Sequence, residues 1–216
     1  MIMAKQDYNQ IAGQKISRIE ALSDGLFAIA MTLLILGIVI PSAEGIDSEA
    51  KLIDEFLKLA PKFLSYLLGF MTLGIFWVGH STQFKFIDKT DRHLTWLTIF
   101  FWMVVSIIPF STSFLSSFIN FKFAIGLYWL NIFLCGVTLY FHWGYAEKNN
   151  LLDETLDGQT IGKAVRNRII QAQIFYAVAA LACFLNNYLS VCLFILIQLN
   201  YALAVFFSSE KSQEKR

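Results

Sequence analysis

The stretch GLFAIAMTLLILGIVI (residues 25–40) carries no charged residue, and Thr32 is its only hydroxyl side chain. An uncharged apolar run of this length predicts a membrane-spanning helix, because a hydrocarbon core of about 30 Å needs about 20 helical residues. Pro41 follows the run directly, and proline ends a helix because it lacks the backbone N–H. We therefore expect a first span over residues 19–40.

Five further apolar runs follow along the chain. Together with the first they give six expected spans, at residues 19–40, 63–83, 94–118, 121–146, 169–186 and 188–207. Pro61 suits the opening turn of the second span, where a missing N–H does no harm. The sequence therefore predicts an all-α membrane protein with a single six-helix transmembrane domain over residues 1–216, including a polar C-terminal tail at 209–216.

The composition excludes an ordinary soluble enzyme. Hydrophobic residues make up 56% of the chain, charged residues only 15%, and the mean hydropathy is +0.57; an average soluble domain carries about 25% charged residues. The net charge of +1 gives no reason to expect a nucleic-acid partner. Cys135, Cys183 and Cys192 lie in apolar runs, so we expect small buried hydrophobes and not a metal site or a disulfide framework.

The positions of lysine and arginine predict the orientation. Of the 17 basic residues, 13 fall in the N-terminal segment, the second and fourth connections and the tail, and 4 fall on the other side. By the positive-inside rule, both termini are then cytoplasmic in a multi-pass protein of the cell membrane. The N-terminus superficially resembles a signal peptide, but Glu20 and Asp24 precede a long apolar run, so we expect no cleavage.

Residues 47–59, between the first two spans, have the pattern of a short amphipathic helix. Leu52, Ile53, Phe56 and Leu57 take one face, and Asp54, Glu55 and Lys58 take the other. Two interpretations stay open: the helix lies at the outer membrane interface, or it packs on the bundle.

Ionisable groups at membrane depth are few, and each is a functional candidate because it is costly there. Asp24 follows Ser23 near the start of the first span, about a turn and a half after Arg18. These residues either form a polar network at the mouth of a pathway, or Asp24 simply complements the helix dipole. Trp77 and His80 share one face of the second span, although a lone His at a helix end is more often structural.

Enzyme and classical channel motifs are missing. The sequence has no HExxH, nucleophile elbow, Walker loop or CxxC, so we expect no catalytic residue, cofactor or resident metal. The TVGYG potassium filter and the arginine ladder of a voltage sensor are also missing. Pro109 lies inside the third span and predicts a kink. A secondary transporter or proton pathway using Asp24 and His80 stays an alternative, as does a non-conducting scaffold.

Residues 18–36, RIEALSDGLFAIAMTLLIL, resemble the first-helix signature of the transmembrane protein 175 potassium channels. That signature is an Arg, then Phe-Ser-Asp, then an apolar helix with Thr-Leu-Leu; Leu22 stands where the family has Phe. FWVGH (76–80), followed by Asp91 and Leu94, resembles the second helix and loop of the family. SIIPFST (106–112) resembles the third helix.

The resemblance to the single-repeat prokaryotic form implies a homotetramer in the bacterial inner membrane. Its central pore would be lined by the first helix and conduct K⁺, with other monovalent cations as further candidates. The family's apolar constriction falls on Ile29, with further layers at Leu33 and Leu36, and Thr32 is the hydroxyl beside it. The residues of the polar network at the pore mouth and between the helices would be Arg18, Ser23, Asp24, Trp77 and His80.

Independently of the family resemblance, the spacing of Ile29, Leu33 and Leu36 places them on one stripe of a helix. Taken alone, such a stripe more often faces lipid or packs in a core, because membrane helices are apolar all round. Four copies around an axis would instead form a narrow apolar neck that gates by dewetting.

Overall fold

A computed structural model describes the backbone of residues 9, 11–153 and 158–213, and the side chains of these residues except 158–159 and 204–213. Apart from one isolated antiparallel bridge between Ile87 and Leu152, the regular structure of this part is helical. The helices are α2 (Ile16–Leu36), α3 (Glu49–Leu57), α4 (Ala60–Phe84), α5 (Arg92–Val105), α6 (Ile108–Ser117), α7 (Lys122–Lys148), α8 (Gly158–Leu181), a short 3₁₀ helix (Ala182–Phe184) and α9 (Asn187–Gln213).

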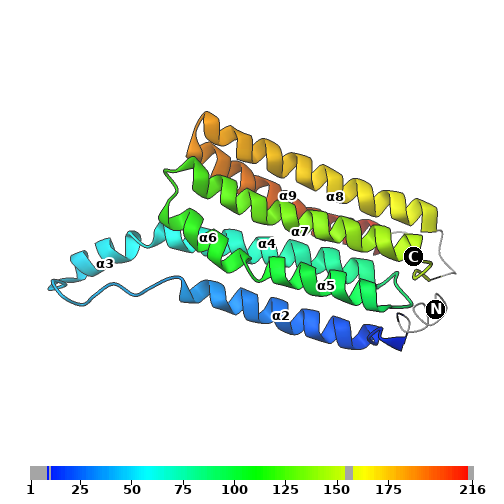
Figure 1. Cartoon of the computed structure of the whole chain (residues 1–216). Coiled ribbons are helices and arrows are strands. Elements are labelled where there is room, and N and C mark those ends of the chain that lie inside the picture. The colour runs from blue at the N-terminus through cyan, green and yellow to red at the C-terminus, as the bar shows by residue number, and fades with distance from the viewer. Residues whose placement is uncertain (1–8, 10, 154–157, 214–216) are drawn as a thin grey trace.

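The long helices run antiparallel in one bundle, so α2 begins and α9 ends at the same end (Figure 1). α5 and α6 together make one pass through it. α7 lies in the interior, with buried residues from Ala124 to Ala146 along its length. α2 lies at one side of the bundle and buries only one of its faces.

Five helical segments are long and apolar enough to cross a membrane: Ile16–Leu36, Ala60–Phe84, Arg92–Ser117, Lys122–Lys148 and Thr160–Phe184. The apolar part of α9, Asn187–Leu203, is shorter. The prediction of a multi-helix membrane protein is therefore supported, and the sixth span expected at 188–207 falls on α9 and stays a prediction. Of the polar tail expected at 209–216, residues 209–213 continue α9, and 214–216 lie outside the described residues.

The first helix is shorter than the apolar run that predicts it. α2 ends at Leu36, with Gly37 as its C-cap, so Pro41 does not end it. A β-carbon added at Gly37 would lie 2.8 Å from the Ser113 hydroxyl of α6. The end of α2 thus lies close to α6, and this tertiary contact is absent from a hydropathy pattern.

The third expected span is broken, not merely kinked. α5 ends at Val105 and α6 begins at Ile108, with Pro109 in the first turn of α6, where its missing N–H breaks the ladder back to Val105. The break is bridged by the buried Asn131 of α7. Its Nδ2 donates to the Val104 carbonyl (2.9 Å), and its Oδ1 accepts from the Ser111 hydroxyl (2.8 Å).

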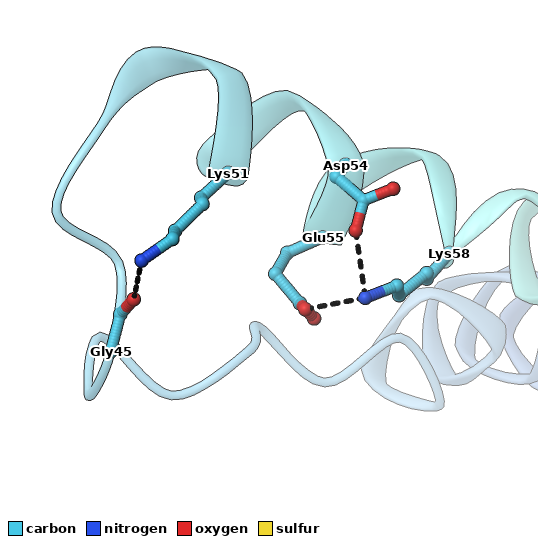
Figure 2. Close-up of polar contacts among 5 residues, drawn as sticks. All are labelled: Gly45, Lys51, Asp54, Glu55 and Lys58. Carbon is cyan, nitrogen blue, oxygen red and sulfur yellow. Dashed lines mark hydrogen bonds and ion pairs between the residues drawn. The ribbon is translucent and has the colours of Figure 1, made fainter.

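The amphipathic helix expected at 47–59 is present as α3, which projects beyond one end of the bundle (Figure 1). None of its residues is buried, so the packed alternative finds no support in this subunit. Its charged side chains pair locally: Lys58 bonds Asp54 (2.8 Å) and Glu55 (2.7 Å), and Lys51 lies 3.5 Å from the Gly45 carbonyl (Figure 2). These contacts hold the pKa of Lys58 above its usual value. The expected place of α3 at the membrane interface stays a prediction.

The expectation of three buried cysteines is correct for Cys135 and Cys183 and wrong for Cys192. Cys192 lies on the outward face of α9, one position after the buried Val191. An all-apolar span does not reveal from its sequence which face points inward.

We expect Asn131→Leu to lower the free energy of unfolding by about 1–3 kcal/mol, because it leaves the Val104 carbonyl and the Ser111 hydroxyl buried without this partner. Unfolding of the purified protein in detergent measures the change. Asn167→Leu, at an exposed position of α8, is the matched control and should alter stability little. Equal losses in the two variants would contradict the bridging role of Asn131.

Candidate functional site

α2 has two clearly different faces. The buried face repeats every three or four residues and consists of Ile19, Ser23, Phe27, Ala30 and Leu34, which pack into the bundle. A second face, to one side of the packed one, is apolar and uncovered: Leu22 is 58% exposed, Ile29 62%, Leu33 48% and Leu36 71%. The three residues of the expected constriction therefore lie together on one outward stripe, which we call the α2 stripe (Leu22, Ile29, Leu33 and Leu36).

Thr32 lies beside this stripe and is exposed. Its hydroxyl donates to the Ile29 carbonyl of its own helix at 2.8 Å. A hydroxyl oxygen has two lone pairs, so the Thr32 oxygen can still accept from water or contact a cation. The hydroxyl is thus held in one orientation by the residue that forms the expected constriction.

Two adjacent residues of α2 accept hydrogen bonds from tryptophans on two other helices. The Trp77 indole of α4 donates to the Asp24 carboxylate at 2.8 Å. The Trp102 indole of α5 donates to the buried Ser23 hydroxyl at 2.9 Å. These two bonds fix the rotation of α2 about its own axis and keep the α2 stripe pointing away from the bundle. Trp102 was not among the residues singled out from the sequence, although a tryptophan inside a span signals a need for an acceptor.

His80 lies apart from this pair of bonds, in the core. It is 2% exposed and stacks on Phe101 with ring centres 5.0 Å apart. Its Nε2 has no hydrogen-bond partner among the described residues. The structure therefore brings Asp24 and Trp77 together, and it places His80 in an aromatic packing position.

A second buried polar group surrounds His142, which sequence reasoning left unassigned. Its Nδ1 lies 2.9 Å from Gln83 Oε1, and its Nε2 lies 3.2 Å from the Thr98 hydroxyl. Gln83 also donates to the Leu139 carbonyl at 3.1 Å. These bonds connect α4, α5 and α7, and the residues involved are far apart in the sequence.

Arg18 is exposed and forms no hydrogen bond or ion pair with the residues that the structure describes. It lies four residues before Leu22, so it continues the α2 stripe at the end where α2 begins. Arg18 is thus on the same side as the expected constriction, whereas Asp24 is directed at α4.

Asp91 fixes the segment that leads into α2. It caps α5 by accepting from the Leu94 backbone N–H (2.8 Å), and it also accepts from Asn9 (2.8 Å) and from the Tyr145 hydroxyl of α7 (2.6 Å). A side chain that satisfies a helix start and two further donors is well suited to hold three segments together. The start of α2 is thereby tied to α5 and α7.

The described residues contain no group of three or more His, Cys, Asp or Glu side chains that could hold a metal ion.

Residues 18–109 match the model of a family described as endosomal/lysosomal potassium channel TMEM175. A protein of Streptomyces collinus named potassium channel is 38% identical over 103 residues, 48% of this chain and 48% of that protein. A potassium channel of Chamaesiphon minutus is 35% identical over 102 residues, 47% and 50% of the two chains. The human endosomal/lysosomal proton channel TMEM175 is 35% identical over 80 residues, 35% of this chain and 16% of that one.

The matched part thus spans about half the length of these bacterial relatives. Solved structures extend the likeness to most of the chain. The crystal structure of a lysosomal potassium-selective channel TMEM175 homologue from Chamaesiphon minutus aligns with a TM-score of 0.76 and 26% identity, over 88% of this chain and 97% of that one. The potassium channel MtTMEM175, 18% identical with a TM-score of 0.58, shares the fold. Residues 18–109 therefore carry the sequence features of the TMEM175 channel family, and most of the chain has the fold of a TMEM175 homologue.

Proposed function

We propose that this chain is one subunit of a homotetrameric, K⁺-permeable channel whose pore is lined by α2. The observation that carries the proposal is the α2 stripe: an uncovered apolar face, separate from the face that packs in the bundle, within the family-matched segment. The relatives named potassium channels support the choice of ion. The family is one of ion channels and not a class of enzymes.

The mechanism follows from what lines such a pore. Four copies of Ile29, with Leu33 and Leu36 beyond it, would form an apolar neck that excludes water when narrow and conducts when wide. A hydrated cation that enters the neck finds no ring of carbonyls to replace its water. Selectivity would then be modest, and it would favour K⁺ because K⁺ loses its hydration more easily than Na⁺.

The polar residues would act mainly by holding α2. The bonds of Ser23 and Asp24 to Trp102 and Trp77 set the rotation of the helix, and opening would require a movement that these bonds permit. Arg18, at the end of the stripe, would lie at the mouth of the pore. By the positive-inside rule, the distribution of basic residues supports a mouth on the cytoplasmic side of a cell membrane.

A secondary transporter that uses Asp24 and His80 is not favoured, since the relatives are named channels. His80 also lies in an aromatic core position, away from the α2 stripe. Because animal relatives are named proton channels, proton flux belongs in every assay beside K⁺ flux.

We expect Ile29→Asn to increase passive K⁺ flux into liposomes, by at least severalfold, because a polar ring wets the neck. Flux through reconstituted protein under a K⁺ gradient measures the change. Ile174→Asn, the same replacement at a similarly exposed position of α8, is the control and should leave flux near its original value. Flux that rises equally in both variants, or in neither, would contradict a neck at Ile29.

We expect Thr32→Ala to lower the permeability of K⁺ relative to Na⁺ by less than tenfold, because one hydroxyl contact contributes about 1 kcal/mol. Reversal potentials under bi-ionic conditions give the ratio directly. Thr138→Ala, which removes a threonine hydroxyl bonded to its own helix on α7, serves as the control. An unchanged ratio in Thr32→Ala would remove the hydroxyl from the account of selectivity.

A further inference from the structure

An open groove of about 680 Å³ runs along the bundle between α4 and α8, away from the α2 stripe. α2, α7 and α9 complete its lining. Phe70 and Thr82 lie near the two ends of its α4 wall, twelve residues apart, which is about 18 Å along a helix. The groove is therefore long and narrow enough to hold an extended hydrocarbon chain.

The polarity of the lining changes along the groove. Asp24, Trp77, Thr82, Arg168 and Tyr201 lie toward the end where α2 and α8 begin and α4 ends. Toward the middle of the bundle the lining is mainly apolar, with Met31, Phe70, Met71, Ile75 and Ala172 among its residues, and Gln173 and Tyr176 are its polar members. A polar end near the membrane surface and an apolar end at depth match the two parts of a lipid.

Arg168 is the cation among the residues that line the groove, and its side chain is exposed. It directly precedes the span expected at residues 169–186, and its guanidinium carbon lies 6.0 Å from the ring centre of Tyr201. It pairs with no carboxylate in the described part of the chain, whereas its neighbour Arg166 binds Glu147. An exposed guanidinium beside an apolar groove, next to the start of a span, is well placed to bind an anionic lipid headgroup at the membrane surface.

Gly74 lies in the α4 wall of the groove and borders open space. A β-carbon built at Gly74 would meet no other heavy atom within 4 Å. Side chains of the same subunit therefore leave the space beside α4 at Gly74 unfilled.

We propose that the groove binds an anionic phospholipid, with an acyl chain along α4 past Gly74 and the phosphate on Arg168. The guanidinium fork suits a phosphate, which it can bind through two parallel hydrogen bonds. This inference does not rest on the proposed channel activity.

A second copy of the chain fits the groove less well, because it has few carboxylates to offer Arg168. Within the apolar segments that the structure describes, the acidic residues are Glu20, Asp24 and Glu147. Asp24 already accepts a hydrogen bond from Trp77, and Glu147 accepts one from Arg166. Glu20 is the remaining carboxylate in these segments. A phospholipid carries its phosphate at the membrane surface, so it can supply an anion to Arg168 however the subunits are arranged.

The test uses delipidated full-length protein and two lipids with the same acyl chains, phosphatidylglycerol and phosphatidylcholine. Native mass spectrometry counts the lipids bound and gives their affinities. We expect tighter binding of phosphatidylglycerol by the original protein, and a loss of about tenfold in that affinity for Arg168→Gln. Lys163→Gln makes the same charge change at another exposed position of α8 and should retain the affinity.

The apolar half of the groove is tested separately. Gly74→Trp should fill it and abolish binding of both lipids at this site. Gly126→Trp, at a glycine of α7 that is equally free of neighbours and lies outside the groove, should leave binding unchanged. Helix content and the unfolding midpoint confirm that each variant folds, and Glu20→Gln should bind like the original.

Equal phosphatidylglycerol affinity in Arg168→Gln and Lys163→Gln would overturn the proposal. So would normal lipid binding by a folded Gly74→Trp variant. If the original protein binds no lipid there and Gly74→Trp instead changes the number of copies in the particle, the groove is an interface between subunits and the lipid assignment is wrong.

Discussion

The arrangement of this protein depends on two adjacent hydrogen bonds on α2. The Ser23 hydroxyl accepts a hydrogen bond from Trp102, and the Asp24 carboxylate accepts one from Trp77. Two indoles on two different helices are therefore bonded to the same turn of α2. Inside a membrane, apolar contacts alone distinguish poorly between the faces of an apolar helix, because lipid tails are as apolar as leucine. Two directional bonds on consecutive residues set the rotation of α2, and with it the face that the α2 stripe presents.

The same reasoning explains the roles of the other polar groups. Asn131 bridges the break between α5 and α6, and Asp91 ties the start of α2 to α5 and α7. Each of these side chains is buried among apolar neighbours, where an unmade hydrogen bond is expensive. A few polar side chains thus define the positions of helices whose apolar surfaces would allow several arrangements.

The sequence predicts the helical class and the approximate spans well, because every membrane-crossing segment must satisfy its own backbone and stay apolar for about 20 residues. Pro109 locates the break in the third span by local chemistry alone. The end of α2 at Leu36 could not be predicted, since it depends on the approach of α6 to Gly37. Asn131 as the bridge was equally hidden, because its partners lie 20 or more residues away.

For the candidate site, periodicity places Ile29, Leu33 and Leu36 on one stripe, and the family resemblance singles them out. Only the structure shows that this stripe is uncovered and separate from the packed face. The expected grouping of Arg18, Asp24, Trp77 and His80 separates into an Asp24–Trp77 bond, an exposed Arg18 and a core His80. Which of these residues meet depends on which helices are neighbours, and the spacing of residues along one sequence does not reveal that.

The central claim is that the α2 stripe faces a water-filled axis and not lipid. Labelling with a membrane-impermeant cationic thiol reagent during K⁺ flux tests it most directly, in a Cys192→Ser background that removes the exposed native cysteine. The account predicts that Leu36→Cys reacts and that its modification reduces flux, while Ile174→Cys on the outer face of α8 does neither. Failure of Leu36→Cys to react, or reaction without any change in flux, would contradict it.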